Sequence, residues 1–231
     1  MEKHEQGNWE YWQQEYAAEN VESCVFRVYG RIFRDELGIS GAKGEKLLDF
    51  GCGAGAAARF FRAKGFDVHG VDISAPSIEN CRRRMPDLAT HFSVIDPKPK
   101  PDQVFFGGGF DVVVGIQSMI YFTNRDFETL MRCLHRQMKP GAIIYAAMVG
   151  TKCWYYDHSK EDVDGLRNVS ISNGRLNFTN YFVNFTHSEQ HLLEKFHLFE
   201  KIHVGYYDSR FSENEGSDFH YTFIGRKALG R

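Results

Sequence analysis

Short apolar runs alternate with amphipathic stretches along most of the chain, a pattern typical of strands separated by helices. Two runs near the C-terminus are joined by a polar turn, which indicates an antiparallel final pair. The sequence therefore predicts an α/β fold. The expected strands are 46–50, 66–71, 91–95, 110–116, 142–148, 199–207 and 218–224, and the expected helices are 56–62, 77–85, 126–138 and 186–196.

Residues 150–185 interrupt the alternation of strands and helices. Polar and apolar positions alternate from Asn168 to Phe185, and Asn173-Gly174 is the signature of a tight hairpin turn. We interpret the segment as an inserted β-hairpin or lid after the fifth strand. The following Thr186-His187-Ser188-Glu189 reads as a capping box, so the last helix is expected to open at Thr186.

Aromatic residues gather near the N-terminus, where residues 8 to 37 read as two helices within a helical cover of residues 1–44. The aromatic side chains either pack against the main domain or close over a bound ligand. The insert is too short to fold alone, so residues 1–231 are expected to form one domain. The aromatic residues of the first helix are Trp9, Tyr11, Trp12 and Tyr16.

Composition excludes several classes of protein. The formal net charge of −2 gives no general attraction to nucleic acid or to an anionic membrane. The Arg82-Arg83-Arg84 run is interpreted as a solvated helix face. Five scattered cysteines without a C-x-x-C pair argue against a zinc site or a disulfide framework, so no metal is expected, and they fit a reducing cytoplasm. A polar start and the lack of a long apolar run predict neither a signal peptide nor a membrane span.

The strongest chemical signal is a glycine turn between the first strand and the first helix after it, which reads Gly51-Cys52-Gly53-Ala54-Gly55. Such a turn lets a cofactor approach the backbone at a helix N-terminus. The spacing Gly51-x-Gly53-x-x-Ala56 also fits a dinucleotide-binding loop. Asp49 changes the balance, because a carboxylate at the strand tip repels a pyrophosphate and attracts an ammonium group.

The acidic residue followed by three alternating glycines resembles the first motif of the class I methyltransferases. The resemblance runs in order over residues 45–227 and implies a doubly wound, seven-stranded, mostly parallel sheet with an antiparallel last strand. It also implies that S-adenosylmethionine is the cofactor and S-adenosylhomocysteine the product. Lys139-Pro140-Gly141 before a strand is a second family hallmark, here with Ala142 where another glycine is usual. In this family an N-terminal helix covers the methionine end, which Tyr11, Trp12 and Tyr16 match loosely.

The second strand ends at Asp72, which can accept two hydrogen bonds from a ribose diol or can cap the next helix. Ile73 would then lie against the adenine. Asp96, at the third strand tip, either accepts from the adenine amino group or caps the turn into Pro97. The residues expected to contact the cofactor are Tyr11, Trp12, Tyr16, Asp49, Gly51, Cys52, Gly53, Gly55, Asp72, Ile73, Ser77, Ile95, Asp96, Ile116 and Gln117.

Catalytic residues are harder to identify, because a sulfonium cofactor is already electrophilic and the protein mainly aligns the acceptor. Tyr121, after the fourth strand, and His187, at the end of the insert, are the candidates, although Tyr121 could simply pack and His187 could be exposed and idle. Tyr121, Trp154 and Tyr181 are expected to bind the acceptor.

The favoured function is methyl transfer to an oxygen or nitrogen of a small molecule. Alternatives are a methyltransferase acting on a protein or nucleic acid, a non-catalytic S-adenosylmethionine-binding subunit, and an NAD-dependent oxidoreductase. After the fourth strand the chain reads Gly115-Ile116-Gln117-Ser118 rather than an Asn-Pro-Pro-Tyr-like tetrapeptide, which weighs against methylation of base amino groups. The sequence leaves open whether the protein is a monomer or a homodimer.

Overall fold

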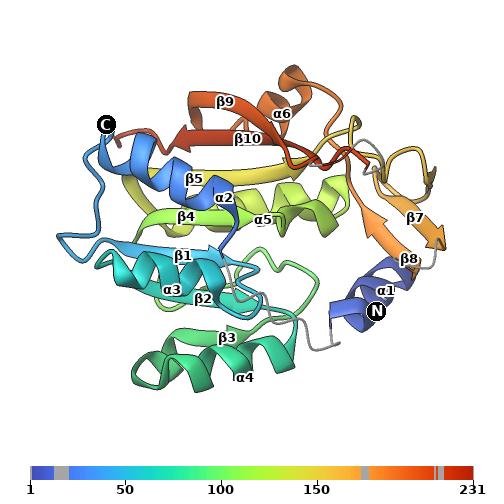
Figure 1. Ribbon diagram of the computed structural model, residues 1–231. Helices are drawn as coiled ribbons and strands as arrows, with labels where there is room; N and C mark the ends of the chain where they lie inside the picture. The colour runs from blue at the N-terminus through green and yellow to red at the C-terminus, as the bar shows by residue number, and fades with distance from the viewer. Residues whose placement is uncertain (1, 13–20, 173–176, 211, 213–215, 231) are drawn as a thin grey trace.

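A seven-stranded sheet with the order β3-β2-β1-β4-β5-β10-β9 forms the centre of the computed structural model, which describes residues 2–12, 21–172, 177–210, 212 and 216–230 (Figure 1). All neighbouring pairs from β3 to β5 are parallel, and β10 runs antiparallel to both β5 and β9. The predicted α/β fold is confirmed. The strands are β1 Lys46–Phe50, β2 Asp67–Asp72, β3 Phe92–Val94, β4 Phe110–Ile116, β5 Met138–Val149, β9 Glu200–Asp208 and β10 Phe219–Arg226.

The central strands are apolar on both faces because helices cover both sides of the sheet. Leu47 and Leu48 of β1 point to opposite faces and are both fully buried. One core lies between the sheet and α5, α6 and a second, small sheet. The other lies between the sheet and α2, α3 and α4. The helices are α2 Ser23–Val28, α3 Ala56–Ala63, α4 Ala75–Arg84, α5 Asn124–Gln137 and α6 Glu189–Lys195.

The insert after β5 forms a three-stranded antiparallel sheet of β6 Ser159–Glu161, β7 Arg167–Ser172 and β8 Asn177–Val183. The pairing of β7 with β8 confirms the predicted hairpin, and its expected turn at Asn173-Gly174 lies outside the described residues. The buried residues Val169, Tyr181 and Val183 of the insert belong to the same core as α5. The insert is therefore packed into the main domain.

The N-terminal helices lie in two different places (Figure 1). Helix α1, Lys3–Trp12, packs on β8, where the Asn8 side chain donates to the Phe182 carbonyl oxygen at 3.0 Å and accepts from its N–H at 2.9 Å. Helix α2 instead packs on the main sheet and continues into a π-helical turn, Tyr29–Arg34. In the described part of the chain, no helix combines the length and apolar character that crossing a membrane requires.

The start of the last helix differs from the sequence prediction. Helix α6 begins at Glu189, and its N-cap is Ser188, whose hydroxyl accepts from the His191 N–H at 3.1 Å. Thr186 cannot open the helix because its backbone extends the sheet. Its N–H donates to the Val149 carbonyl oxygen at 2.8 Å, and its carbonyl accepts from the Thr151 N–H at 3.1 Å.

Candidate functional site

Asp49 sits at the centre of the carboxyl edge of the sheet and is only 2% exposed. Its atom Oδ2 is buried and has no hydrogen-bond partner among the described residues. Burial, followed by the nearby charge of Asp72, raises the pKa of Asp49 to about 7, although a bond to the Ala58 backbone lowers it. A buried carboxylate oxygen without a donor is costly, so this position suits a cationic or hydrogen-bond-donating ligand.

The glycine turn adopts the left-handed backbone that its sequence predicts, with φ values of 71° at Gly51, 50° at Gly53 and 83° at Gly55. The turn is anchored to β2, because the N–H groups of Gly51 and Cys52 donate to the Val71 carbonyl oxygen at 2.8 and 3.0 Å. A Cβ atom at Gly51 would overlap the Ser118 side chain. A Cβ at Gly53 would meet no described atom within 4 Å, which leaves open space beside this backbone.

Asp72 links the glycine turn to the start of α4. Its carboxylate accepts from the N–H groups of Gly53 and Ser74, both at 2.8 Å, and burial raises its pKa. The N-cap of α4 is Ser74, whose hydroxyl accepts from the N–H of buried Ser77 at 3.3 Å. Asp72 is therefore not the helix cap. Each carboxylate oxygen has two lone pairs, so both oxygens can accept a further bond.

The ends of β2 and β3 lie together, since the Ile95 N–H donates to the Asp72 carbonyl oxygen at 2.9 Å. Ile73 and Ile95 are both half-buried there. Asp96 is exposed and accepts from the Lys98 N–H at 3.0 Å, and it forms an ion pair with Lys100 at 3.1 Å. This geometry matches the turn-capping alternative for Asp96. The hydrogen bond from the Lys98 backbone N–H, followed by the hydrogen bond from the Lys100 side chain, holds the pKa of Asp96 below its usual range.

A cavity of about 110 Å³ lies between the glycine turn and α2. Val21, the N-cap Glu22 and Val25 of α2 line this cavity. Sequence reasoning missed them because the helical spacing of Val25 reads as ordinary core. The expectation that Tyr11, Trp12 and Tyr16 cover the cofactor stays a prediction, because Tyr16 and the side chains of Tyr11 and Trp12 lie outside the described residues. The remaining lining residues are Asp49, Gly51, Cys52, Ala56, Ala57 and Ile116.

Gln117 follows β4 with a left-handed φ of 54°, an unusual conformation for a residue other than glycine. Its side-chain amide donates to the Tyr207 hydroxyl at 2.9 Å. The Tyr207 ring stacks on His220 at 5.1 Å, and burial lowers the pKa of His220. Sequence reasoning missed Tyr207 and His220, although the antiparallel final pair brings the end of β9 and the start of β10 to this edge.

The residues expected to bind the acceptor gather on the insert side. The hydroxyl groups of Tyr121 and Tyr181 are hydrogen-bonded at 2.7 Å. The Tyr155 ring lies 6.3 Å from Tyr181 and 5.0 Å from Trp154. Three segments separated in sequence thus form one aromatic wall. His187 is exposed and contacts Tyr156 and His191 instead, so the structure does not bring it to this wall.

A doubly wound sheet with a glycine turn and two acidic residues at its carboxyl edge is typical of α/β proteins that bind nucleoside-containing cofactors. A family model described as "Methyltransferase domain" matches residues 18–212. The chain therefore belongs to this methyltransferase family.

The individual relatives share only a moderate fraction of identical residues with this chain. The chain is 28% identical to the methyltransferase GfsG of Streptomyces halstedii over 60% of this chain and 50% of the relative. It is also 28% identical to the O-methyltransferase cnsE of Penicillium expansum over 59% and 49%. The chain thus spans about half the length of the curated relatives it matches. Among solved structures, a SAM-dependent methyltransferase from Methanosarcina mazei has a TM-score of 0.66 and 19% identity, covering 91% of this chain and 100% of the other. That similarity supports the fold.

Proposed function

We propose that the chain binds S-adenosylmethionine beside Asp49 and transfers its methyl group to an oxygen or nitrogen of a small molecule. The observation that carries the proposal is the buried Oδ2 of Asp49, which lacks a donor in the described structure. The cofactor offers an ammonium group and carries no phosphate, so it suits this carboxylate. A dinucleotide would instead bring its diphosphate toward a carboxyl group.

The other edge residues fit the same cofactor. The remaining lone pairs of Asp72 can accept from a ribose diol, while its bonds to Gly53 and Ser74 fix its orientation. The space beside Gly53 admits a ligand close to the backbone. Ile73 and Ile95 supply half-buried apolar surface for the base. Val21, Glu22 and Val25 of the α2 segment close the cavity above Asp49.

The bound sulfonium group would supply an electrophilic methyl, so this chain's residues need to place the acceptor and exclude water. The Tyr121–Tyr181 hydroxyl pair can hold a polar group of the acceptor, and Tyr155 and Trp154 can pack on its apolar part. An aromatic wall shared between the insert and the main domain supports a small acceptor. GfsG and cnsE, which are named as a methyltransferase and an O-methyltransferase, are compatible with this proposal.

Calorimetry tests the cofactor assignment directly. We expect saturable, one-to-one binding of S-adenosylhomocysteine and no binding of NAD at the same concentrations, because Asp49 repels a diphosphate. A metabolite screen with S-adenosylmethionine labelled in its methyl group then identifies the acceptor. Saturable binding of NAD without a response to S-adenosylhomocysteine would overturn the proposal in favour of an oxidoreductase.

The tyrosine pair tests the acceptor side. Tyr181→Phe removes one hydroxyl and leaves the Tyr121 hydroxyl without this partner, at a cost of about 1–1.5 kcal/mol, or roughly tenfold. With the acceptor from the screen, we expect kcat/KM to fall about tenfold while S-adenosylhomocysteine affinity stays within twofold. Tyr156→Phe is the matched control, since Tyr156 packs on Phe185 and Arg167 outside the wall. Equal losses in both variants would place the acceptor elsewhere.

A further inference from the structure

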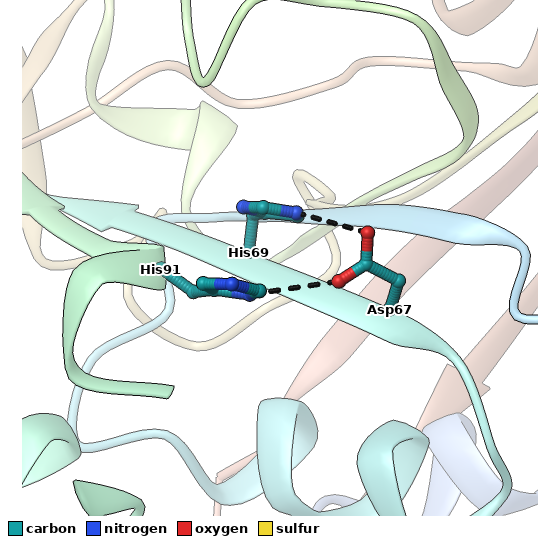
Figure 2. Close-up of side chains that lie close together, drawn as sticks. All are labelled: Asp67, His69 and His91. Carbon is teal, nitrogen blue, oxygen red and sulfur yellow. Dashed lines mark hydrogen bonds and ion pairs between the residues drawn. The ribbon is translucent and has the colours of Figure 1, made fainter. Parts of the chain in front are cut away.

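Asp67, His69 and His91 form a cluster at the opposite end of β2 from Asp72 (Figure 2). Along β2, Asp67 lies about 16 Å and His69 about 10 Å from the strand tip that carries Asp72. Asp67 and His69 point to the same face of the strand, and His91 ends the 3₁₀ turn before β3. The cluster is therefore separate from the cofactor cavity.

The separation between the Asp67 carboxylate and the His69 ring is that of two ligands in one coordination shell, and the His91 ring lies beside the same carboxylate. Figure 2 shows one carboxylate oxygen of Asp67 facing each ring, with Oδ2 3.3 Å from Nε2 of His69 and Oδ1 3.5 Å from Nδ1 of His91. Charge-assisted hydrogen bonds are shorter, at about 2.7–2.9 Å. Two ligands on a tetrahedral ion with bonds of about 2.0–2.1 Å lie about 3.3–3.4 Å apart.

We propose that Asp67, His69 and His91 bind a divalent transition-metal ion of the zinc class. One ligand atom from each residue lies within 4.8 Å of the other two. Two imidazole nitrogens and a carboxylate oxygen favour zinc, cobalt or nickel over calcium or magnesium, which prefer oxygen ligands. Solvent would complete the shell on the exposed Asp67 side. The cysteine pattern could not reveal this site, because its ligands are histidine and aspartate.

Binding requires the rings to turn. The two imidazoles are stacked 4.2 Å apart and within 3° of parallel, so their lone pairs do not yet converge. Nδ1 of His69 is buried without a partner in the part of the chain that is described, so turning this ring breaks its hydrogen bond with Asp67 and its ring packing on His91 and Phe106 but no hydrogen bond at Nδ1. Nδ1 of His91 lies 3.0 Å from the Val68 carbonyl oxygen, and donation to that carbonyl leaves Nε2 as the ligand atom. A backbone acceptor behind a ligating histidine is a common support of metal sites.

A second cluster of similar residues is less suitable. His4, Glu5 and Asp126 also lie close enough to share an ion. However, the Lys98 ammonium group lies 3.7 Å from Glu5 Oε1 and already supplies a positive charge. At the β2 cluster the neighbouring Lys46 ammonium is bound by the carbonyl oxygens of Phe106 and Gly108, both at 2.8 Å. Lys46 therefore does not neutralise the Asp67 carboxylate through a direct ion pair, and this carboxylate can bind an incoming ion.

Titration with Co²⁺ and Zn²⁺ tests the proposal in the full chain. We expect one ion per chain, a Co²⁺ absorption spectrum typical of nitrogen and oxygen ligands, and a higher Tm with Zn²⁺. Asp67→Asn and His91→Ala should each weaken binding at least tenfold. Both side chains are partly exposed, so the variants should fold, and unchanged binding of S-adenosylhomocysteine or an unchanged circular dichroism spectrum would verify this.

The control is the pair of exposed His187 and half-buried His191, whose rings also stack, at 5.1 Å. The double variant His187→Ala/His191→Ala should retain the full affinity for both ions. Absence of saturable binding to wild type would overturn the proposal, and so would binding that Asp67→Asn and His91→Ala leave intact. Loss of binding in the control variant alone would assign the ion to α6.

Discussion

Asp49→Asn is expected to raise the Tm of the ligand-free protein and to lower its affinity for S-adenosylhomocysteine at least a hundredfold. In the free protein Oδ2 is buried without a partner among the residues described, so neutralising the carboxylate removes an unfavourable charge. In the complex the same change removes the charge that attracts the ammonium group and presents an amide donor to it. Loss of one partner of a buried charge pair costs about 3–5 kcal/mol, which corresponds to more than a hundredfold.

Thermal melting and calorimetry on the same samples separate the two effects. A purely structural carboxylate would show a lower Tm and no specific loss of affinity. Asp111→Asn provides a matched control, because Asp111 forms an ion pair with Lys139 at 2.7 Å and lies at the start of β4, away from the carboxyl edge. That variant should bind S-adenosylhomocysteine like the wild type.

The same residue predicts opposite pH dependences for stability and binding. The pKa of Asp49 is about 7 in the folded protein and about 3.9 in an unfolded chain, so the folded state holds an extra proton between these values. The stabilisation from this group is present in full below about pH 3.9 and is lost as the pH rises through 7. A cationic ligand favours the ionised carboxylate, so affinity should instead rise with pH up to about 7 and then level off. Asp49→Asn should remove this rise.

The sequence predicts well which acidic residues lie at the carboxyl edge of the sheet, because parallel strands end at the same edge. Asp72 ends β2 and Asp49 is the last residue but one of β1, and the apolar runs around them indicate where these strands end. The left-handed glycines follow from the same local chemistry, since only glycine adopts this backbone at little cost. The hairpin of the insert is equally local, because its alternation and its Asn-Gly dipeptide both lie within one segment.

Residues that depend on tertiary packing could not be predicted in the same way. The helical spacing of Val25 indicates an apolar face but not that the first turn of α2 closes a cavity over Asp49. Tyr207 meets Gln117 only through the pairing of β9 and β10 beyond β5. Thr186 looks like a helix cap until its backbone is seen to pair with Val149 and Thr151. In each case a contact between distant segments decides the outcome.

The glycine turn provides the last prediction, through two substitutions that differ only in their surroundings. Both Gly51 and Gly53 have positive φ, so alanine costs about 1–2 kcal/mol of backbone strain at either position. At Gly51 the new Cβ also overlaps the Ser118 side chain, which adds about 1–3 kcal/mol of overpacking. At Gly53 the Cβ points into space that holds no described atom within 4 Å.

Gly51→Ala should therefore lose about 2–5 kcal/mol of stability in urea unfolding. Gly53→Ala should lose only the smaller backbone cost and remain folded, yet its affinity for S-adenosylhomocysteine should fall at least tenfold, because the added methyl group occupies the space that the ligand approaches. Calorimetry on the folded Gly53→Ala protein decides the point. If that variant binds S-adenosylhomocysteine as tightly as the wild type, the cofactor does not lie against this turn, and the cavity under α2 has another occupant.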